Sequence, residues 1–116
     1  LQGSRFPVSE GEQLRDFCYV DDVTRGILLT LRNDNINGEV INLASGKPIS
    51  IRKVVELVKE IVGQGAPDFG AVSYRVEENM ALYADITKAK KLLDWDPIVT
   101  LDEGIRKIVH YYQRRM

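Results

Sequence analysis

Four segments of the chain repeat their apolar residues every three or four positions, and this spacing predicts amphipathic helices. The predicted helices cover residues 22–32, 51–62, 86–93 and 101–114. Each follows polar residues that can accept hydrogen bonds from the free N–H groups of a first helical turn. The expected caps are Asp21 with Asp22, Ser50, Asp85, and a capping box formed by Thr100 and Glu103.

Three short runs rich in β-branched and aromatic residues predict strands at residues 17–20, 39–44 and 72–76. Residues 1–14 are interpreted as a loop, and residues 33–38 as a turn that ends in Asn-Gly. The resulting order is β-α-β-α-β-α-α. It predicts an α/β fold, or a mixed α+β fold for the chain in isolation, with three short strands and four helices.

The segment 39–44 (EVINLA) has apolar residues on both faces, which is typical of a strand inside a covered parallel sheet. Three short strands make a small sheet for such a strand to join. The sequence also begins without Met. We therefore expect these residues to be a piece of a longer protein.

The amino-acid composition excludes several classes of function for this chain. With 116 residues the chain fits one domain, and its net charge of −1 argues against a nucleic-acid binder that relies on bulk electrostatics. No apolar run reaches the length of a membrane span, and from the polar residues at the start we expect no secretory leader. One Cys and one His exclude a disulfide framework and a His/Cys metal cluster. We expect a cytoplasmic, metal-free globular domain.

The chain offers few groups for covalent or acid–base catalysis. The only histidine, His110, is interpreted as an ordinary helix-surface residue, and Cys18 as a small apolar residue with an unactivated thiol. The glycines at 63, 65 and 70 follow a helix and lack the spacing of a dinucleotide-binding turn, so they are interpreted as helix-stop and loop residues.

Arg15 and Arg75 are the stronger candidates for chemistry, because each lies beside a predicted strand end. The planar guanidinium group stays charged and can bind two phosphate oxygens at once. The alternative is an ordinary surface arginine, or a local Arg15–Asp16 ion pair that contributes little. The residue types alone leave both interpretations open.

Four segments, in order, resemble motifs of the NAD(P)-dependent nucleotide-sugar epimerases and dehydratases of the extended short-chain dehydrogenase/reductase family. Residues 15–23 resemble RDF-x-YVDDV, and residues 38–46 resemble G-x-x-x-N-[LIV]-[AG]-[ST]-G. Residues 85–97 resemble D-x-[ST]-K-A-x-x-x-L-G-W-x-P, with Asp94 in place of the glycine. Residues 101–105 resemble the closing L-x-E-G-I. The resemblance covers nearly the whole chain.

The resemblance implies that residues 1–116 are the C-terminal, nucleotide-sugar-binding part of such an enzyme. The family's Gly-rich turn and its catalytic Tyr-x-x-x-Lys belong to an N-terminal Rossmann half, and neither motif occurs here. The segment 39–44 is then the strand that returns to the Rossmann sheet. We expect its apolar surface to be covered by another copy of the chain or by crystal neighbours, and a solvated strand there would contradict this.

The resemblance also assigns residue roles. Arg15 and Arg75 match the two family arginines that contact the nucleotide diphosphate, and Asp16 and Phe17 belong to the same pocket segment. Glu78 stands where the family often has an Asp that meets the ribose, and the glycine of the family's R-x-G-D is absent. No residue of this chain is assigned a catalytic or metal-binding role.

The function implied is binding of a nucleotide-diphosphate sugar while the cofactor of the missing half oxidises C4 of the sugar. The cofactor is NAD or NADP in the full-length enzyme, which is expected to be a homodimer. The present chain alone is expected to be inactive and to bind neither cofactor. Two alternatives stay open: a stand-alone binding or scaffold domain without redox activity, and an unrelated small α/β domain.

Overall fold

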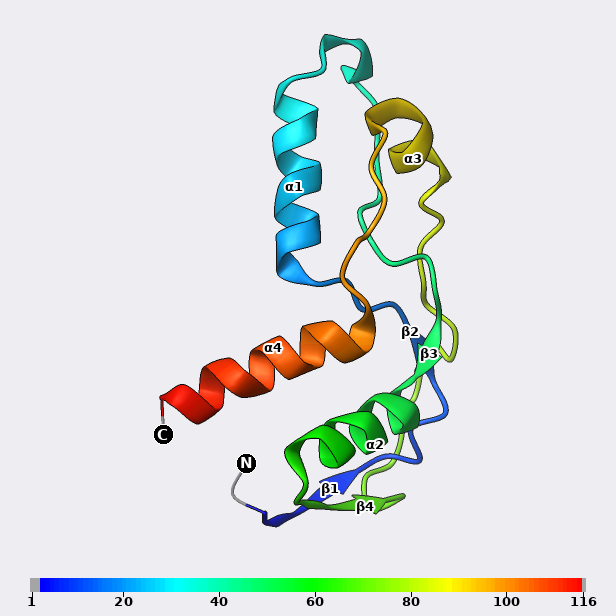
Figure 1. Cartoon of the computed structure of the whole chain (residues 1–116). Helices are drawn as coiled ribbons and strands as arrows, with labels where there is room; N and C mark the ends of the chain where they lie inside the picture. The colour runs from blue at the N-terminus through cyan, green and yellow to red at the C-terminus, as the bar shows by residue number, and fades with distance from the viewer. Residues whose placement is uncertain (1–2, 116) are drawn as a thin grey trace.

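The computed structural model describes residues 3–115, which form a mixed α/β arrangement of four α-helices and short strands (Figure 1). The helices are α1 (Val20–Leu31), α2 (Ile51–Val62), α3 (Thr87–Leu93) and α4 (Leu101–Arg114), with a 3₁₀ turn, η1, at Asp34–Ile36. The strands are β1 (Arg5–Val8), β2 (Leu14–Arg15), β3 (Ile49–Ser50) and β4 (Ala66–Phe69). No helix within residues 3–115 is both long and apolar enough to cross a membrane.

The strands form two separate pairs. β1 runs parallel to β4, with Arg5 opposite Ala66, whereas β2 runs antiparallel to β3, with Leu14 opposite Ser50. Leu14 also forms a bridge to Ala81, which joins the loop after β4 to β2. In Figure 1, α2 lies over β1 and β4 at one end, and α1 and α3 stand side by side at the other.

The hydrophobic core lies between α1, α3 and the segment that follows α3. Its buried residues are Ile86, Ala89, Leu93 and Trp95, and Leu43 packs against them from the segment before β3. Trp95 is fully buried, and its indole Nε1–H donates a 2.9 Å hydrogen bond to the carbonyl oxygen of Asp22. This bond ties the core to the first turn of α1.

Local capping signals explain where α2 and α4 begin. The Ser50 hydroxyl accepts a hydrogen bond from Lys53 N–H at the start of α2, and the Thr100 hydroxyl accepts one from Glu103 N–H at the start of α4. Asp85 accepts the N–H of Thr87, the first residue of α3. The caps predicted at Ser50 and Thr100 are confirmed, whereas the N-cap position of α3 is Ile86, so Asp85 lies one residue before it and is not the cap.

The start of α1 corrects two expectations. The helix begins at Val20, two residues earlier than predicted, and its N-cap position is Tyr19, which makes no side-chain capping bond. Asp21 and Asp22 therefore lie inside the first turn and are not caps. Asp22 instead turns its carboxylate to the loop before α4, where it accepts hydrogen bonds from Ile98 N–H (3.1 Å) and Val99 N–H (3.0 Å).

The strand positions are also corrected. Residues 17–20 form no strand, because this segment leads directly into α1, and pairing occurs just before it, at β2. Residues 1–14 are not loop throughout, since β1 lies within their described part. Residues 72–76 form no strand, and strand pairing occurs earlier in the chain, at β4. Which residues form strands depends on pairing partners that are distant in the sequence, and β-propensity alone does not identify those partners.

The segment 39–44 is not a strand among the described residues, which corrects the third strand prediction. Ile41 and Leu43 pack against the core, but Val40 is 77% exposed. An extended segment becomes a strand only when a neighbour accepts and donates its backbone hydrogen bonds, and no described strand lies alongside it. Its expected pairing with a returning sheet stays a prediction.

The molecule is flat and open. Its principal extents are 50 × 38 × 17 Å, and its radius of gyration is 16.9 Å, against about 13 Å for a compact domain of this length. The outward side of α1 exposes large apolar residues, among them Ile27 (51%), Leu28 (49%) and Leu31 (76%). An apolar helix face of this kind is normally buried against another element.

Candidate functional site

The candidate site is built on β2 and on the loop that follows β4. Arg15, the last residue of β2, directs one guanidinium nitrogen to the carbonyl oxygen of Leu14 (2.7 Å) and the other to the carboxylate of Glu78 (3.4 Å). Within residues 3–115, the alternative local Arg15–Asp16 ion pair is not formed. Arg15 pairs instead with a carboxylate 63 residues away in the sequence.

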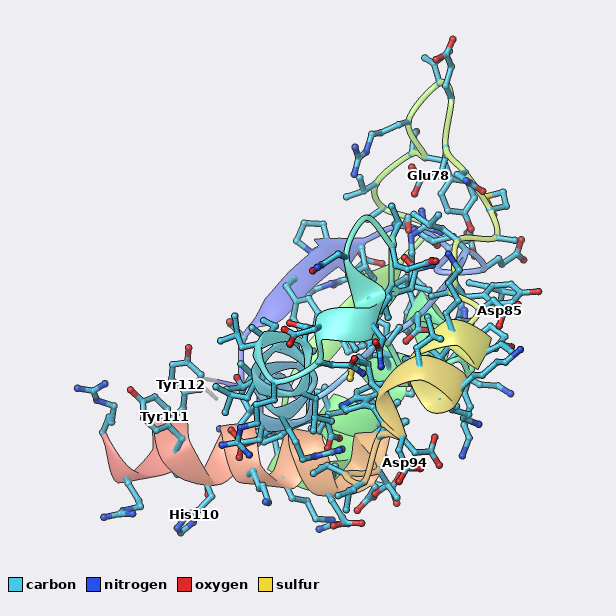
Figure 2. The ribbon with its side chains drawn as sticks, turned by 90° about the horizontal axis from the view of Figure 1, so that it is seen from above. Glu78, Asp85, Asp94, His110, Tyr111 and Tyr112 are labelled. Atoms are coloured by element: carbon cyan, nitrogen blue, oxygen red, sulfur yellow. The ribbon has the colours of Figure 1, made fainter. Side chains whose placement is uncertain are left out.

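Arg75 reaches the same carboxylate from its own loop. Its Nε lies 3.7 Å from Glu78 Oε2, and a backbone hydrogen bond from Glu78 N–H to Arg75 C=O (3.1 Å) closes the turn between them. The Glu78 side chain is 13% exposed and the Arg15 side chain 23%, whereas that of Arg75 is 91% exposed. Figure 2 shows Glu78 on the yellow-green loop that projects from the rest of the ribbon.

Gln13 is a further member of this cluster that the sequence analysis does not single out. Its side-chain amide donates to Glu78 Oε1 (3.3 Å), and its own oxygen, Oε1, is buried without a hydrogen-bond partner. The spacing of Gln13 and Arg15 is the sequence signal that indicates this role. Gln13 and Arg15 are two residues apart in extended backbone, and such residues point to the same face.

Asp16 points away from the arginine cluster and organises neighbouring loops. Its carboxylate accepts hydrogen bonds from Ser45 N–H (2.8 Å), the Ser45 hydroxyl (2.7 Å), Gly46 N–H (2.9 Å) and Ala84 N–H (3.4 Å). Burial raises the pKa of Asp16, but the hydrogen bonds from Ser45, Gly46 and Ala84 together outweigh it, so the pKa lies below its ordinary value. In this structure Asp16 holds the loops on either side of the site together.

Phe17 faces a different space. With Leu14 it lines a cavity of about 650 Å³ that lies between the first turns of α2 and α4. Lys47 and Lys53 contribute positive charge to the same cavity. The structure therefore brings Arg15, Arg75 and Glu78 together, whereas Asp16 contacts Ser45 and Gly46, and Phe17 lines the separate cavity.

The remaining reactive groups are not assembled into a site. Cys18 is half-buried beside the core, and burial raises the pKa of its thiol, with the nearby carboxylates of Asp22 and Asp16 adding to the rise. His110 lies on the exposed surface of α4 near Tyr111 and Tyr112 (Figure 2). Within residues 3–115, no group of three His, Cys, Asp or Glu side chains is arranged to hold a metal ion.

Comparison with protein families gives a match over almost the whole chain. The sequence model described as GDP-mannose 4,6 dehydratase matches residues 2–108. Among curated relatives, a UDP-glucuronate 4-epimerase of Thermodesulfobacterium geofontis is 37% identical over 88% of this chain and 31% of its own length. UDP-glucuronic acid decarboxylase 1 of Xenopus tropicalis is 38% identical over 100% of this chain and 27% of its own length. The chain thus spans less than a third of the length of either relative.

Solved structures show the same similarity in three dimensions. The UDP-glucuronic acid 4-epimerase of Bacillus cereus, solved in complex with UDP-glucuronic acid and NAD, is 32% identical with a TM-score of 0.82. The similarity covers 97% of this chain and 35% of that one. The flat arrangement of helices and short strand pairs therefore recurs as part of a larger enzyme.

Proposed function

The chain belongs to the GDP-mannose 4,6-dehydratase family of nucleotide-sugar epimerases and dehydratases, and from this membership we propose that it is the nucleotide-sugar-binding part of an NAD(P)-dependent enzyme. Arg15 and Arg75 would hold the diphosphate of a nucleotide sugar. Glu78 would face the ribose, with Asp16 and Phe17 in the neighbouring part of the pocket. Residues 1–116 would form this part as one unit.

The observation that carries the proposal is the convergence of the two arginines on one carboxylate. Arg15 and Arg75 are 60 positions apart in the sequence, yet both place a guanidinium nitrogen within 4 Å of Glu78. A site that already binds a carboxylate with two guanidinium groups offers the charge and the forked geometry that phosphate oxygens need. Holding the diphosphate fixes where the sugar lies, and such positioning lowers the entropic barrier to reaction.

The cofactor is assigned to a partner half, because this sequence contains no G-x-G-x-x-G turn. NAD or NADP bound there would supply hydride transfer at C4 of the sugar. The exposed apolar side chains of α1 and of segment 39–44 are the surfaces we propose for contact with that half. The full enzyme is proposed to be a cytoplasmic homodimer, and the present chain alone is proposed to be inactive.

The test uses the intact enzyme that contains these residues, with UDP-glucuronic acid as the first substrate of a panel of UDP-, dTDP-, GDP- and CDP-sugars. Arg15→Ala should raise KM at least about tenfold, because a charge-assisted bidentate contact is worth about 1.5–3 kcal/mol. Arg15→Lys should recover only part of the loss, because an ammonium group cannot bind two oxygens in a fork.

The matched control is Arg5→Ala. Arg5 forms an exposed ion pair with Asp68 at the β1–β4 pair, so its removal also deletes one arginine and one ion pair. We expect KM for this variant to stay within about twofold of the wild-type value. Unchanged KM and kcat/KM in Arg15→Ala would remove that residue from the proposed site.

A further inference from the structure

The Glu78 carboxylate is held where an anionic ligand group would meet the arginines. It accepts from Arg15 (3.4 Å) and from the Gln13 amide (3.3 Å), and Arg75 Nε lies 3.7 Å from its second oxygen. We infer that Glu78 is an internal anion that keeps the two arginines in place and competes with the phosphate groups of a ligand for them. The inference rests on the proposed function, because it concerns the same two arginines.

The ion pair between Arg15 and Glu78 explains the competition. One terminal nitrogen of its guanidinium group is already bound to the Leu14 carbonyl oxygen at 2.7 Å, and the other faces Glu78. These two bonds use two of the five N–H donors of Arg15, so a phosphate oxygen can bind a remaining donor, but it then lies beside the Glu78 carboxylate and competes with it for the same positive charge. The carboxylate also repels an incoming anion, and this repulsion is weakly screened because the Glu78 side chain is only 13% exposed.

Gln13 and the turn between Arg75 and Glu78 hold the Glu78 carboxylate beside the two arginines. Gln13 is buried, and its amide fixes the Glu78 carboxylate on the side away from Arg75. The backbone bond from Glu78 to Arg75 holds both residues in one turn. Displacement of the Glu78 side chain would therefore free both guanidinium groups together, at the cost of its bond to Gln13.

The experiment is calorimetric titration of the full chain with inorganic pyrophosphate, which carries the charge of a nucleotide diphosphate but no ribose. Glu78→Gln keeps the size of the side chain and removes its charge, so it should bind pyrophosphate about tenfold more tightly than the wild-type chain. Glu78→Asp draws the carboxylate back by one methylene and should fall between the two. Circular dichroism melting curves check that each variant is folded.

Glu77→Gln is the matched control, since Glu77 is exposed in the same loop and its substitution removes the same charge one residue away. Its pyrophosphate affinity should stay within about twofold of wild type. Equal or weaker binding by Glu78→Gln overturns the inference. If Arg15→Ala, made in the Glu78→Gln background, leaves pyrophosphate binding unchanged, it is the proposed function that fails, so the two failures are distinguishable.

Discussion

Removal of the Asp22 carboxylate should destabilise the fold far more than its place near a helix start suggests. Asp22 is 3% exposed, and one of its oxygens accepts the backbone N–H groups of Ile98 and Val99 while the other faces Arg25 at 3.2 Å. Asp22→Ala leaves these two backbone donors without an acceptor. At about 1–3 kcal/mol for each of the two partly buried donors, we expect a loss of about 2–6 kcal/mol in the free energy of unfolding.

Two further substitutions separate the hydrogen bonds from the charge. Asp22→Asn keeps one oxygen that can accept both N–H groups but turns an amide toward Arg25, so we expect a loss of about 1–2 kcal/mol. Asp21→Ala removes a neighbouring carboxylate from the same helical turn. Asp21 is exposed, and its substitution should change stability by no more than about 0.5 kcal/mol.

The assay is urea denaturation followed by the fluorescence of Trp95, the only tryptophan of the chain. This indole is buried and donates a hydrogen bond to the Asp22 carbonyl oxygen, so its emission reports on the packing of the core against the first turn of α1. The free energy of unfolding of a domain is usually about 5–15 kcal/mol. A loss of about 3 kcal/mol would therefore lower the urea concentration at the unfolding midpoint by a large fraction. Equal losses in Asp22→Ala and Asp21→Ala would refute the reasoning.

The remaining predictions concern backbone strain and acid. Gly11→Ala should cost about 2–4 kcal/mol in unfolding free energy, because its φ is +75° and a Cβ would lie 2.7 Å from the backbone nitrogen of Arg52. Gly38→Ala, at φ +82° with open space around it, should cost only about 1 kcal/mol in the same urea titration. Asp16 and Asp22 have pKa values below the unfolded value of 3.8, so their contribution to stability is complete above that pH and is lost as pH falls toward the folded-state values. Acid titration should show this loss, and Asp22→Asn should reduce its slope below pH 4 (an unchanged slope would exclude Asp22 as a source).

The sequence predicts the helices well because their signals are local. The spacing of apolar residues and the caps at Ser50 and Thr100 act within one or two turns, and α2 and α4 begin and end where these signals place them. The αL conformation of Gly63 ends α2 for the same reason. The family motifs are also local strings, and they identify the family that the comparisons show.

Strands and site geometry depend on partners far along the chain, so only the tertiary structure decides them. β1 exists because residues 66–69 lie beside it, whereas segment 39–44 has the composition of a strand but no described neighbour to bond. Asp22 has the sequence position of a helix cap, but its carboxylate accepts hydrogen bonds from the backbone N–H groups of Ile98 and Val99 instead. The sequence by itself determines that Arg15 and Arg75 are present and predicts that they bind an anion. Long-range packing of the loop after β4 against β2 decides that both meet at Glu78.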